Sequence, residues 1–333
     1  MPKWNNAITD VPGIKVGQAQ DDSALTGVTV ILCDDGTTGG VDQRGGAPGT
    51  RETDALRPMH LVQYVNAVVL AGGSAFGLDA ASGVMKYLEE KKVGYNAGIA
   101  RIPIVPAAIL MDLAVGKSDV RPDPQMGYLA CQAASDRPPQ QGNAGAGAGA
   151  SVGKILGIRQ ATKSGIGTAS LAIGNGIWIG ALVAVNAFGD VIDPANGRII
   201  AGARSISIGL LNGRKPGTFA NTLEIMKTFA GRTILDYASH QNTVIGVVAT
   251  NAKLTKEDTN RLAQMAHNGI ARCIRPAHSL FDGDTIFAIA TNKRKADPMI
   301  VSSFAAEVVS SAIVNAIINT QPAGGLPSAS ELV

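Results

Sequence analysis

The chain has 333 residues, of which 45% are hydrophobic, and a formal net charge of +3. A chain of this length and apolar content can bury a large core in one or two domains. Acidic and basic residues are mixed along the chain, and aromatic residues make up only 4%. We therefore expect no nucleic-acid partner, because such proteins concentrate positive charge and often use aromatic side chains for base stacking.

The cysteines and the N-terminal residues indicate where the protein works. Cys33, Cys131 and Cys273 are an odd, widely spaced set, which argues against a disulfide framework and fits a reducing compartment. The first residues lack the apolar core of a signal peptide, and no uninterrupted apolar run reaches about 18 residues. We expect a cytoplasmic protein with no membrane partner. Without CxxC pairs or histidine clusters, no metal or cofactor is expected either.

The first half of the chain alternates between strand and helix patterns. Its predicted elements are, in chain order, strands at 28–32 and 67–70, a glycine-rich turn at 72–77, a helix at 78–91, a strand at 102–105 that runs into an apolar segment ending at 113, and a helix at 127–134. Residues 136–149 (DRPPQQGNAGAGAG) then form the strongest loop signal. This loop is either a flexible surface segment or the lining of a site, because glycine lets backbone approach a ligand closely.

The second half of the chain contains a hairpin, several strands and three helices. Its predicted elements are strands at 165–173 and 177–188 joined by a GNG turn, a short strand after Asp190, a helix at 221–230, a buried strand at 244–249, a helix at 256–271 with Thr255 as N-cap, a strand at 285–290 and an apolar core helix at 302–318. Paired strands flanked by helices predict helical layers over sheets.

The dipeptide Asn–Thr occurs three times, and one occurrence differs from the others. Residues 221–222 open a helix and residues 319–320 end one. Asn242 and Thr243 instead follow a polar loop and directly precede a buried strand. A cut before Thr243 would leave its amine and its hydroxyl together at the start of a rigid strand. The residue types alone also allow a simpler interpretation, a β-branched residue that begins a strand after an Asn turn.

The first of these interpretations has a chemical logic. A threonine hydroxyl is a weak nucleophile until a base takes its proton. A free α-amine on the same residue, with an ordinary pKa of about 7.7–8.0, is a suitable base. Before that amine exists, the same hydroxyl can attack the preceding carbonyl, and this attack produces the cut.

Six segments resemble the DmpA/NylC family of self-cleaving N-terminal-nucleophile aminopeptidases and amidases. They follow the family's order and span nearly the whole chain: RGGAPGTRETD (44–54), LAGGSAFGLDAASGV (70–84), RIPIVPAAILMDL (101–113), GAGAGASVGK (145–154), NTVIGVVATN (242–251) and FDGDTIFAIAT (281–291). The resemblance implies an α/β fold, an αββα sandwich formed by residues 1–333. Cleavage between Asn242 and Thr243 would give a large fragment, 1–242, and a small fragment, 243–333. It also implies a homo-oligomer, often a tetramer of such pairs.

The same resemblance implies roles for individual residues. Lys154, at the end of the GAGAG segment, would lie near Thr243 and hold its amine neutral or steady a developing negative charge. Asn186 would supply a side-chain amide to the oxyanion. Lys163 is a second basic residue that could fill the role of Lys154. Without the resemblance, Lys154 reads as a solvated loop lysine and Asn186 as a turn residue.

Asp282 and Asp284 flank a glycine just before a strand. Carboxylates at positions i and i+2 of an extended segment project to the same face, and their proximity would raise one pKa. They would then orient Thr243 and its ammonium group. The alternative is an Asp–Gly turn with two solvated acids. Serine-type members of the family carry serine in place of the first acid, so the resemblance to those members extends to Asp284 but not to Asp282.

The predicted activity is hydrolysis of amide or peptide bonds in small amine-bearing substrates. Thr at the nucleophile position, together with the DGD motif, looks closer to the hydrolases of 6-aminohexanoate (nylon) oligomers than to the serine aminopeptidases. One alternative is an acyltransferase similar to ornithine acetyltransferases, and another is a non-cleaving structural relative. None of the histidines (His60, His240, His267, His278) has a spacing that suggests a triad with serine.

Overall fold

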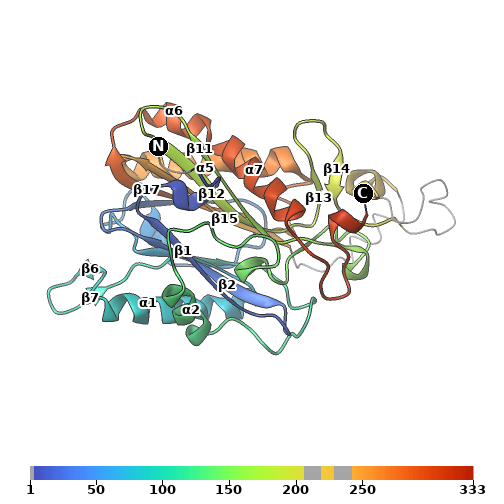
Figure 1. Cartoon of the computed structure of the whole chain (residues 1–333), viewed down its shortest axis with the longest axis horizontal. Helices are drawn as coiled ribbons and strands as arrows, with labels where there is room; N and C mark the ends of the chain where they lie inside the picture. Colours follow the sequence, from blue (N-terminus) through green and yellow to red (C-terminus); the bar gives the residue numbers. More distant parts are fainter. Residues whose placement is uncertain (1–3, 206–218, 229–241, 333) are drawn as a thin grey trace.

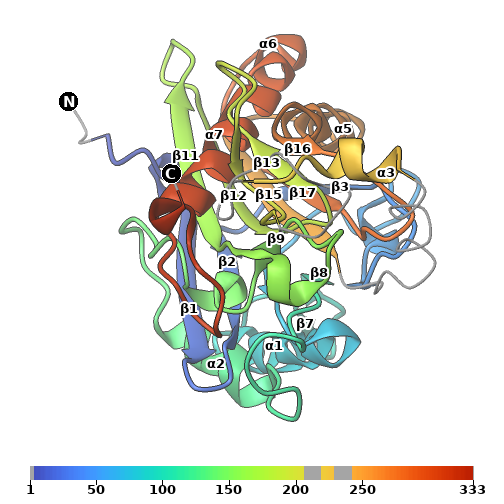
Figure 2. The ribbon, with the colours of Figure 1, turned by 90° about the vertical axis from the view of Figure 1, so that its right-hand side faces the viewer.

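The fold is built around two five-stranded sheets, each covered on its outer face by helices (Figure 1). The computed structural model describes residues 4–205, 219–228 and 242–332. One pair of helices lies below the first sheet and three helices lie above the second, and the view turned by 90° shows the same order of layers (Figure 2). This arrangement confirms the predicted αββα sandwich.

The first sheet comes entirely from the N-terminal part of the chain. Its strand order is β1-β2-β5-β8-β4, and only β5 and β8 run parallel to each other. Helices α1 and α2 pack on its outer face through a cluster of buried aliphatic side chains. The bounds are β1 Ile14–Asp21, β2 Thr26–Cys33, β4 Thr50–Arg51, β5 Ala67–Ala71, β8 Ala107–Ile109, α1 Ala80–Glu90 and α2 Pro124–Gln132.

The second sheet has the order β11-β12-β15-β17-β3, with β15 and β17 parallel and the other pairs antiparallel. Every residue of β15 is buried, because sheet and helices cover both of its faces. The bounds are β3 Thr38–Gln43, β11 Ile166–Ala172, β12 Trp178–Asn186, β15 Thr243–Ala252, β17 Thr285–Arg294, α5 Lys256–Cys273, α6 Pro298–Ser303 and α7 Ala305–Ile318.

Smaller elements complete the described part of the chain. They are β6 Tyr95–Asn96 with β7 Arg101–Ile102, β9 Ser151–Val152 with β10 Thr162–Lys163, the three-stranded set β13 Asp190–Ile192, β14 Ile199–Ala201 and β16 Ile274–Arg275, and the short helix α3 Thr222–Met226. The β6–β7 hairpin projects from the sandwich beside α1 (Figure 1).

Most predicted elements are observed near their predicted bounds. The turns and helix caps predicted from short sequence motifs are among them. The GNG hairpin joins β11 to β12, and the Thr255 hydroxyl accepts a hydrogen bond from Asp258 N in a capping box at the start of α5. Asn221 caps α3 in the same way through Glu224 N, and Asn319 ends α7. The stretch Pro298–Ile318 is apolar enough to cross a membrane, yet 61% of its most apolar window is buried inside the protein.

Two predicted bounds are wrong. Of the strand expected at 102–105, only Ile102 lies in a strand, β7, and the next strand, β8, begins at Ala107, because Pro103 and Pro106 cannot donate to a ladder. In the segment between β7 and β8, side chains bind the backbone N–H groups. Asn66 Oδ1 accepts a hydrogen bond from Ile104 N, and Glu52 Oε2 accepts one from Val105 N. The helix expected from 302 begins earlier, at Pro298, where the Asp297 side chain caps it, and it is interrupted at Phe304.

The glycine-rich loop is not a surface segment over its second half. Residues 144–150 are all buried between the two sheets. Alanines of the loop pack into the core between the sheets, and the Lys163 ammonium group donates to the carbonyls of Gly147 (3.3 Å), Ala150 (3.1 Å) and Ser164 (2.5 Å). The loop therefore leads the chain through the interior toward Lys154.

Candidate active site

Thr243 is the first residue of β15 and lies in the middle of the second sheet. It faces Asn186, the last residue of β12, in the antiparallel register, and Ile245 pairs with Thr285 of β17 on the other side. Residues directly opposite each other in an antiparallel pair place their side chains on the same face. Thr243 is only 3% exposed. The predicted nucleophile is therefore held between two strands beside the predicted oxyanion donor.

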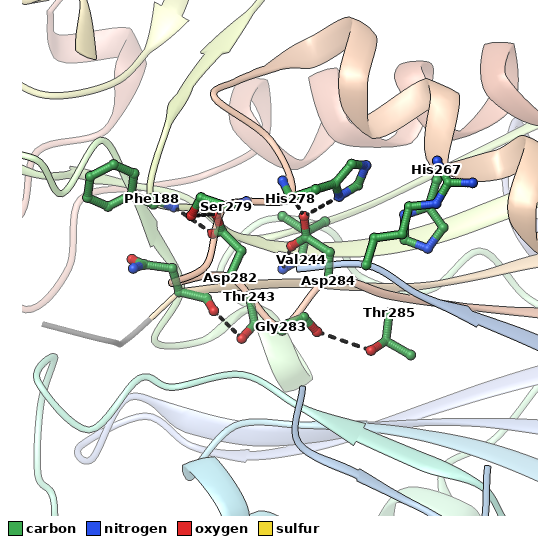
Figure 3. Close-up of polar contacts among 12 residues, drawn as sticks. Phe188, Thr243, Val244, His267, His278, Ser279, Asp282, Gly283, Asp284 and Thr285 are labelled. Carbon is green, nitrogen blue, oxygen red and sulfur yellow. Dashed lines mark hydrogen bonds and ion pairs between the residues drawn. The ribbon is translucent and has the colours of Figure 1, made fainter. Parts of the chain in front are cut away.

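The peptide bond between Asn242 and Thr243 has a defined hydrogen-bond environment. The carbonyl oxygen of Asn242 accepts from the hydroxyl of Thr243, which is the dashed line at Thr243 in Figure 3, and from the backbone N–H of Gly283 at 3.1 Å. Asn242 also forms a parallel bridge with Asp282. The hydroxyl thus lies against the carbonyl group that it would have to attack.

Lys154 and Asn186 form a buried pair next to Thr243. The Lys154 ammonium donates to Asn186 Oδ1 (2.7 Å) and to Asn186 O (3.1 Å), and Ser151 N also donates to Oδ1 (3.1 Å). These donors fix the orientation of the amide, and Asn186 Nδ2 donates to Met111 O (2.9 Å). Burial lowers the pKa of Lys154 to about 7, against the opposing charges of Asp282 and Asp112. The interpretation of Lys154 as a solvated loop lysine is therefore wrong.

Asp282 and Asp284 extend to the same side of their segment, as predicted, and both are buried (Figure 3). Asp282 accepts from the Ser279 hydroxyl (2.5 Å), from Ser279 N (3.1 Å) and from Phe188 N (3.2 Å). Asp284 accepts from Val244 N (2.8 Å), the residue after Thr243. Burial, followed by the neighbouring charge of Asp284, raises the pKa of Asp282 to about 6. The alternative of two solvated acids is therefore wrong.

Two histidines join this cluster, which sequence reasoning missed. His278 Nδ1 lies 2.7 Å from Asp284 Oδ2, and His278 N donates to the same oxygen (3.1 Å). The ring of His267, from α5, meets the ring of His278 edge-on at 4.9 Å. The search for a serine triad overlooked them, although His278 stands only six residues before Asp284. His240 lies outside the described residues.

Lys163 binds a different set of groups from Lys154. Its ammonium group donates to the carbonyls of Gly147, Ala150 and Ser164, and burial lowers its pKa to about 7. The nearby Asp112 accepts from Gly73 N (2.7 Å) and from the Thr26 hydroxyl (2.8 Å), and burial raises its pKa. Within the described ranges, no group of three or more His, Cys, Asp or Glu side chains could hold a metal ion.

Comparison with known proteins identifies the family to which this site belongs. Residues 6–329 match the model of peptidase family S58. The chain is a member of this family. An uncharacterized aminopeptidase of Mycobacterium tuberculosis is 39% identical over 346 residues, which cover 97% of this chain and 96% of the relative. A 6-aminohexanoate-oligomer endohydrolase of Kocuria sp. is 32% identical over 284 residues, which cover 85% of this chain and 74% of the relative.

Solved structures of more distant proteins share the fold. A β-aminopeptidase of Burkholderia sp. superimposes with a TM-score of 0.67 at 23% identity and covers 100% of this chain and 93% of that protein. An L-aminopeptidase D-Ala-esterase/amidase from Ochrobactrum anthropi, described as a variant of the Ntn hydrolase fold, has a TM-score of 0.67 at 22% identity, with 97% and 88% covered.

These findings define the activity class of the S58 member. It is a hydrolase of amide or peptide bonds, of the aminopeptidase and amidase type. None of the relatives named above is an acyltransferase, so the alternative based on ornithine acetyltransferases gains no support.

Proposed function

We propose that the chain cuts itself between Asn242 and Thr243, and that the freed Thr243 then hydrolyses amide bonds in small amine-bearing substrates. The observation that carries this proposal is the contact between the Thr243 hydroxyl and the carbonyl of Asn242 at the start of a buried central strand. The fold of N-terminal-nucleophile hydrolases and the family membership support it.

The proposed cut has two steps. In the first, Thr243 Oγ bonds to the carbonyl carbon of Asn242, the C–N bond breaks, and the hydroxyl proton passes to the Thr243 nitrogen. In the second, water hydrolyses the resulting ester, which restores the hydroxyl and leaves a carboxyl group on Asn242. Rigid placement of the two reacting groups lowers the barrier, because little orientational freedom remains to be lost.

After the cut, the α-amine of Thr243 is the base that activates its own hydroxyl. The hydroxyl attacks the substrate carbonyl, the amine passes the proton to the leaving nitrogen, and water hydrolyses the acyl-enzyme. The Lys154 ammonium favours the neutral form of the amine, since a second positive charge nearby is unfavourable. Because the pKa of Lys154 is lowered to about 7, this influence is strongest below neutral pH.

Asn186 is the proposed donor to the substrate oxyanion. Its Oδ1 accepts from Ser151 N and Lys154, so the donor end of the amide is directed away from both. Fixed donors of this kind stabilise a tetrahedral intermediate because they need no reorganisation during the reaction. Asp284 fixes the backbone after the cut through Val244 N, and the two aspartates supply the negative charge that balances Lys154 and the new ammonium group.

The proposal is tested by mass spectrometry of the purified protein beside the Thr243→Ala variant. We expect two fragments in the wild type, the smaller beginning at Thr243, and one full-length chain in the variant. Thr243→Ser is the matched variant that keeps a hydroxyl nucleophile and should still be cut. A wild-type chain that stays intact, or a Thr243→Ala chain that is cut at the same place, would contradict the proposal.

Substrate choice is tested on the processed enzyme. We expect release of the amine from small aminoacyl amides, with loss of activity in Thr243→Ala. Linear 6-aminohexanoate oligomers form the second substrate panel, because a named relative acts on such oligomers. Ornithine with an acetyl donor serves as the acyltransferase control, and we expect no transfer.

We also propose that the processed protein is a homo-oligomer. Monomeric proteins rarely expose several large apolar side chains together. Around the β6–β7 hairpin, five such residues are exposed: Met59 (85%), Leu61 (78%), Tyr64 (53%), Ile99 (98%) and Ile102 (43%). The segments 61–64 and 94–96 line one 410 Å³ pocket. Light scattering after size-exclusion chromatography should give a multiple of the 34.1 kDa chain mass, and a mass near 34.1 kDa would contradict the proposal.

A further inference from the structure

The carbonyl of Asn242 has a second donor besides the attacking hydroxyl. When Thr243 Oγ attacks, the hydroxyl gives up its proton and cannot stabilise the negative charge that develops on the carbonyl oxygen. The Gly283 N–H, 3.1 Å from the same oxygen, remains in place. A backbone N–H directed at the developing oxyanion is the kind of group that stabilises tetrahedral intermediates.

The position of Gly283 is tightly constrained. A Cβ atom at this residue would lie 2.2 Å from the carbonyl oxygen of Ala47, so no side chain fits without moving the backbone. Ala47 N donates in turn to Asp282 O (3.0 Å), which joins the two segments. On its other side, Gly283 precedes Asp284, whose side chain connects this turn to Val244 on β15.

His278 supplies two of the three donors that Asp284 receives. Its backbone N–H and its Nδ1 both reach Oδ2, while Val244 N reaches Oδ1. The residue has a φ of 55°, the left-handed conformation that favours glycine and asparagine. This uncommon backbone conformation directs both donors at one carboxylate oxygen.

The groups around His278 leave Asp284 as its charged partner. From α5, His267 is buried and neutral at physiological pH, because burial lowers its pKa to about 4. Asp42 of β3 forms an ion pair with Arg44, just after this strand (2.8 Å). The backbone carbonyl of Asp42 lies 2.9 Å from His267 Nε2. The ring of His278 therefore acts on the turn through Asp284.

We propose that the Gly283 N–H is the oxyanion donor of self-cleavage and that His278, acting through Asp284, is the positioning residue that holds this donor against the Asn242 carbonyl. The inference rests on the proposed cut. In the step concerned, the Oγ–C bond forms and the carbonyl electron pair moves to the oxygen, where Gly283 donates. The pair then returns as the C–N bond breaks, and the hydroxyl proton ends on the Thr243 nitrogen.

The experiment compares two variants that both tolerate the left-handed backbone. His278→Asn keeps a side-chain N–H near the position of Nδ1, whereas His278→Gly removes it. The cleavage half-time is followed by pulse labelling in cell-free translation. We expect His278→Gly to be slower than wild type by on the order of 10- to 100-fold, and His278→Asn to recover most of the rate. His60→Gly, an exposed histidine elsewhere, controls for the loss of an imidazole and should be cut at the wild-type rate.

Each outcome decides the matter. Wild-type cleavage by His278→Gly, or equal slowing in both variants, would overturn the role of His278. A second measurement replaces Gly283 by glycolic acid, which exchanges only the N–H for an ester oxygen. Here we expect slowing on the order of 100-fold, and an unchanged rate would overturn the role of Gly283. A wild-type chain that is never cut would instead refute the proposed function, and the two failures are distinguishable.

Discussion

Replacing Asp284 by asparagine tests how much the buried carboxylate contributes to stability. Oδ1 accepts from Val244 N, and Oδ2 accepts from His278 N and Nδ1. An amide has only one acceptor oxygen, so at least one of the two backbone N–H groups loses its partner. An unpaired buried donor costs about 1–3 kcal/mol, and the remaining bonds weaken from charge-assisted to neutral.

An opposing effect reduces this loss. The charge of Asp284 helps to raise the pKa of Asp282 to about 6, so at pH 8 the two carboxylates repel each other. Asp284→Asn removes the repulsion at pH 8, but at pH 5 Asp282 is protonated and little repulsion remains to be removed. We therefore expect a net destabilisation of about 2 kcal/mol at pH 8 and a larger one at pH 5.

Urea denaturation of uncut protein measures this difference. Both chains carry Thr243→Ala, so that cleavage does not alter the comparison, and free energies of unfolding are obtained with and without Asp284→Asn at pH 5 and pH 8. Asp54→Asn, at an aspartate with an 82% exposed side chain, is the matched control and should change stability by less than about 0.5 kcal/mol. Equal stability of the two proteins, or a greater loss at pH 8 than at pH 5, would refute this reasoning.

Two further outcomes are expected. The pKa of His267 is lowered to about 4 in the folded protein, so the unfolded chain takes up a proton on this histidine at a higher pH than the folded chain does. The free energy of unfolding therefore decreases as the pH falls from 6.5 toward 4, by up to about 1.4 kcal/mol per pH unit. Urea midpoints across this window should fall less steeply in His267→Phe, and parallel slopes would contradict the assignment. In Gly153→Ala, the new Cβ would lie 1.9 Å from Ala203 N, so we expect the neighbouring Lys154 to shift and hydrolysis to slow. Gly157→Ala is the control, because Gly157 has a similar positive φ but open space around it. Equal rates of hydrolysis in the two variants would contradict this prediction.

Local signals in the sequence predicted the elements well, because each has a short-range cause. The hairpin turn, the caps of α3 and α5 and the apolar strands depend on residues within a few positions of each other. The end of β7 at Ile102 has a local cause in Pro103 and Pro106, whereas the side-chain bonds of the segment that follows and the burial of the loop before Lys154 depend on distant partners. Asn66 and Glu52 accept hydrogen bonds from the backbone of the segment after Ile102, and the Lys163 ammonium group donates to carbonyls of the loop.

The site was predictable only in part, for a similar reason. Resemblance to the family pointed to Thr243, Lys154, Asn186 and the two aspartates, and the structure brings them together, but their catalytic roles stay predictions. The backbone donor Gly283 faces Asn242 because β15 pairs with β17, whereas the contact between His278 and Asp284 forms within one turn before β17. No spacing rule within one segment reveals that the Gly283 N–H faces the Asn242 carbonyl, 41 residues earlier in the chain.

The strand order of the second sheet has a consequence for the lifetime of the processed protein. Strands β15 and β17 of the small fragment lie between β12 and β3 of the large fragment, so the two fragments would share one core after the cut. Neither fragment can leave without breaking sheet pairing on both sides. Once they separate, reassembly requires an encounter between two molecules and becomes dependent on concentration. Maturation would thus convert a reversible fold into one whose persistence is governed by its rate of opening.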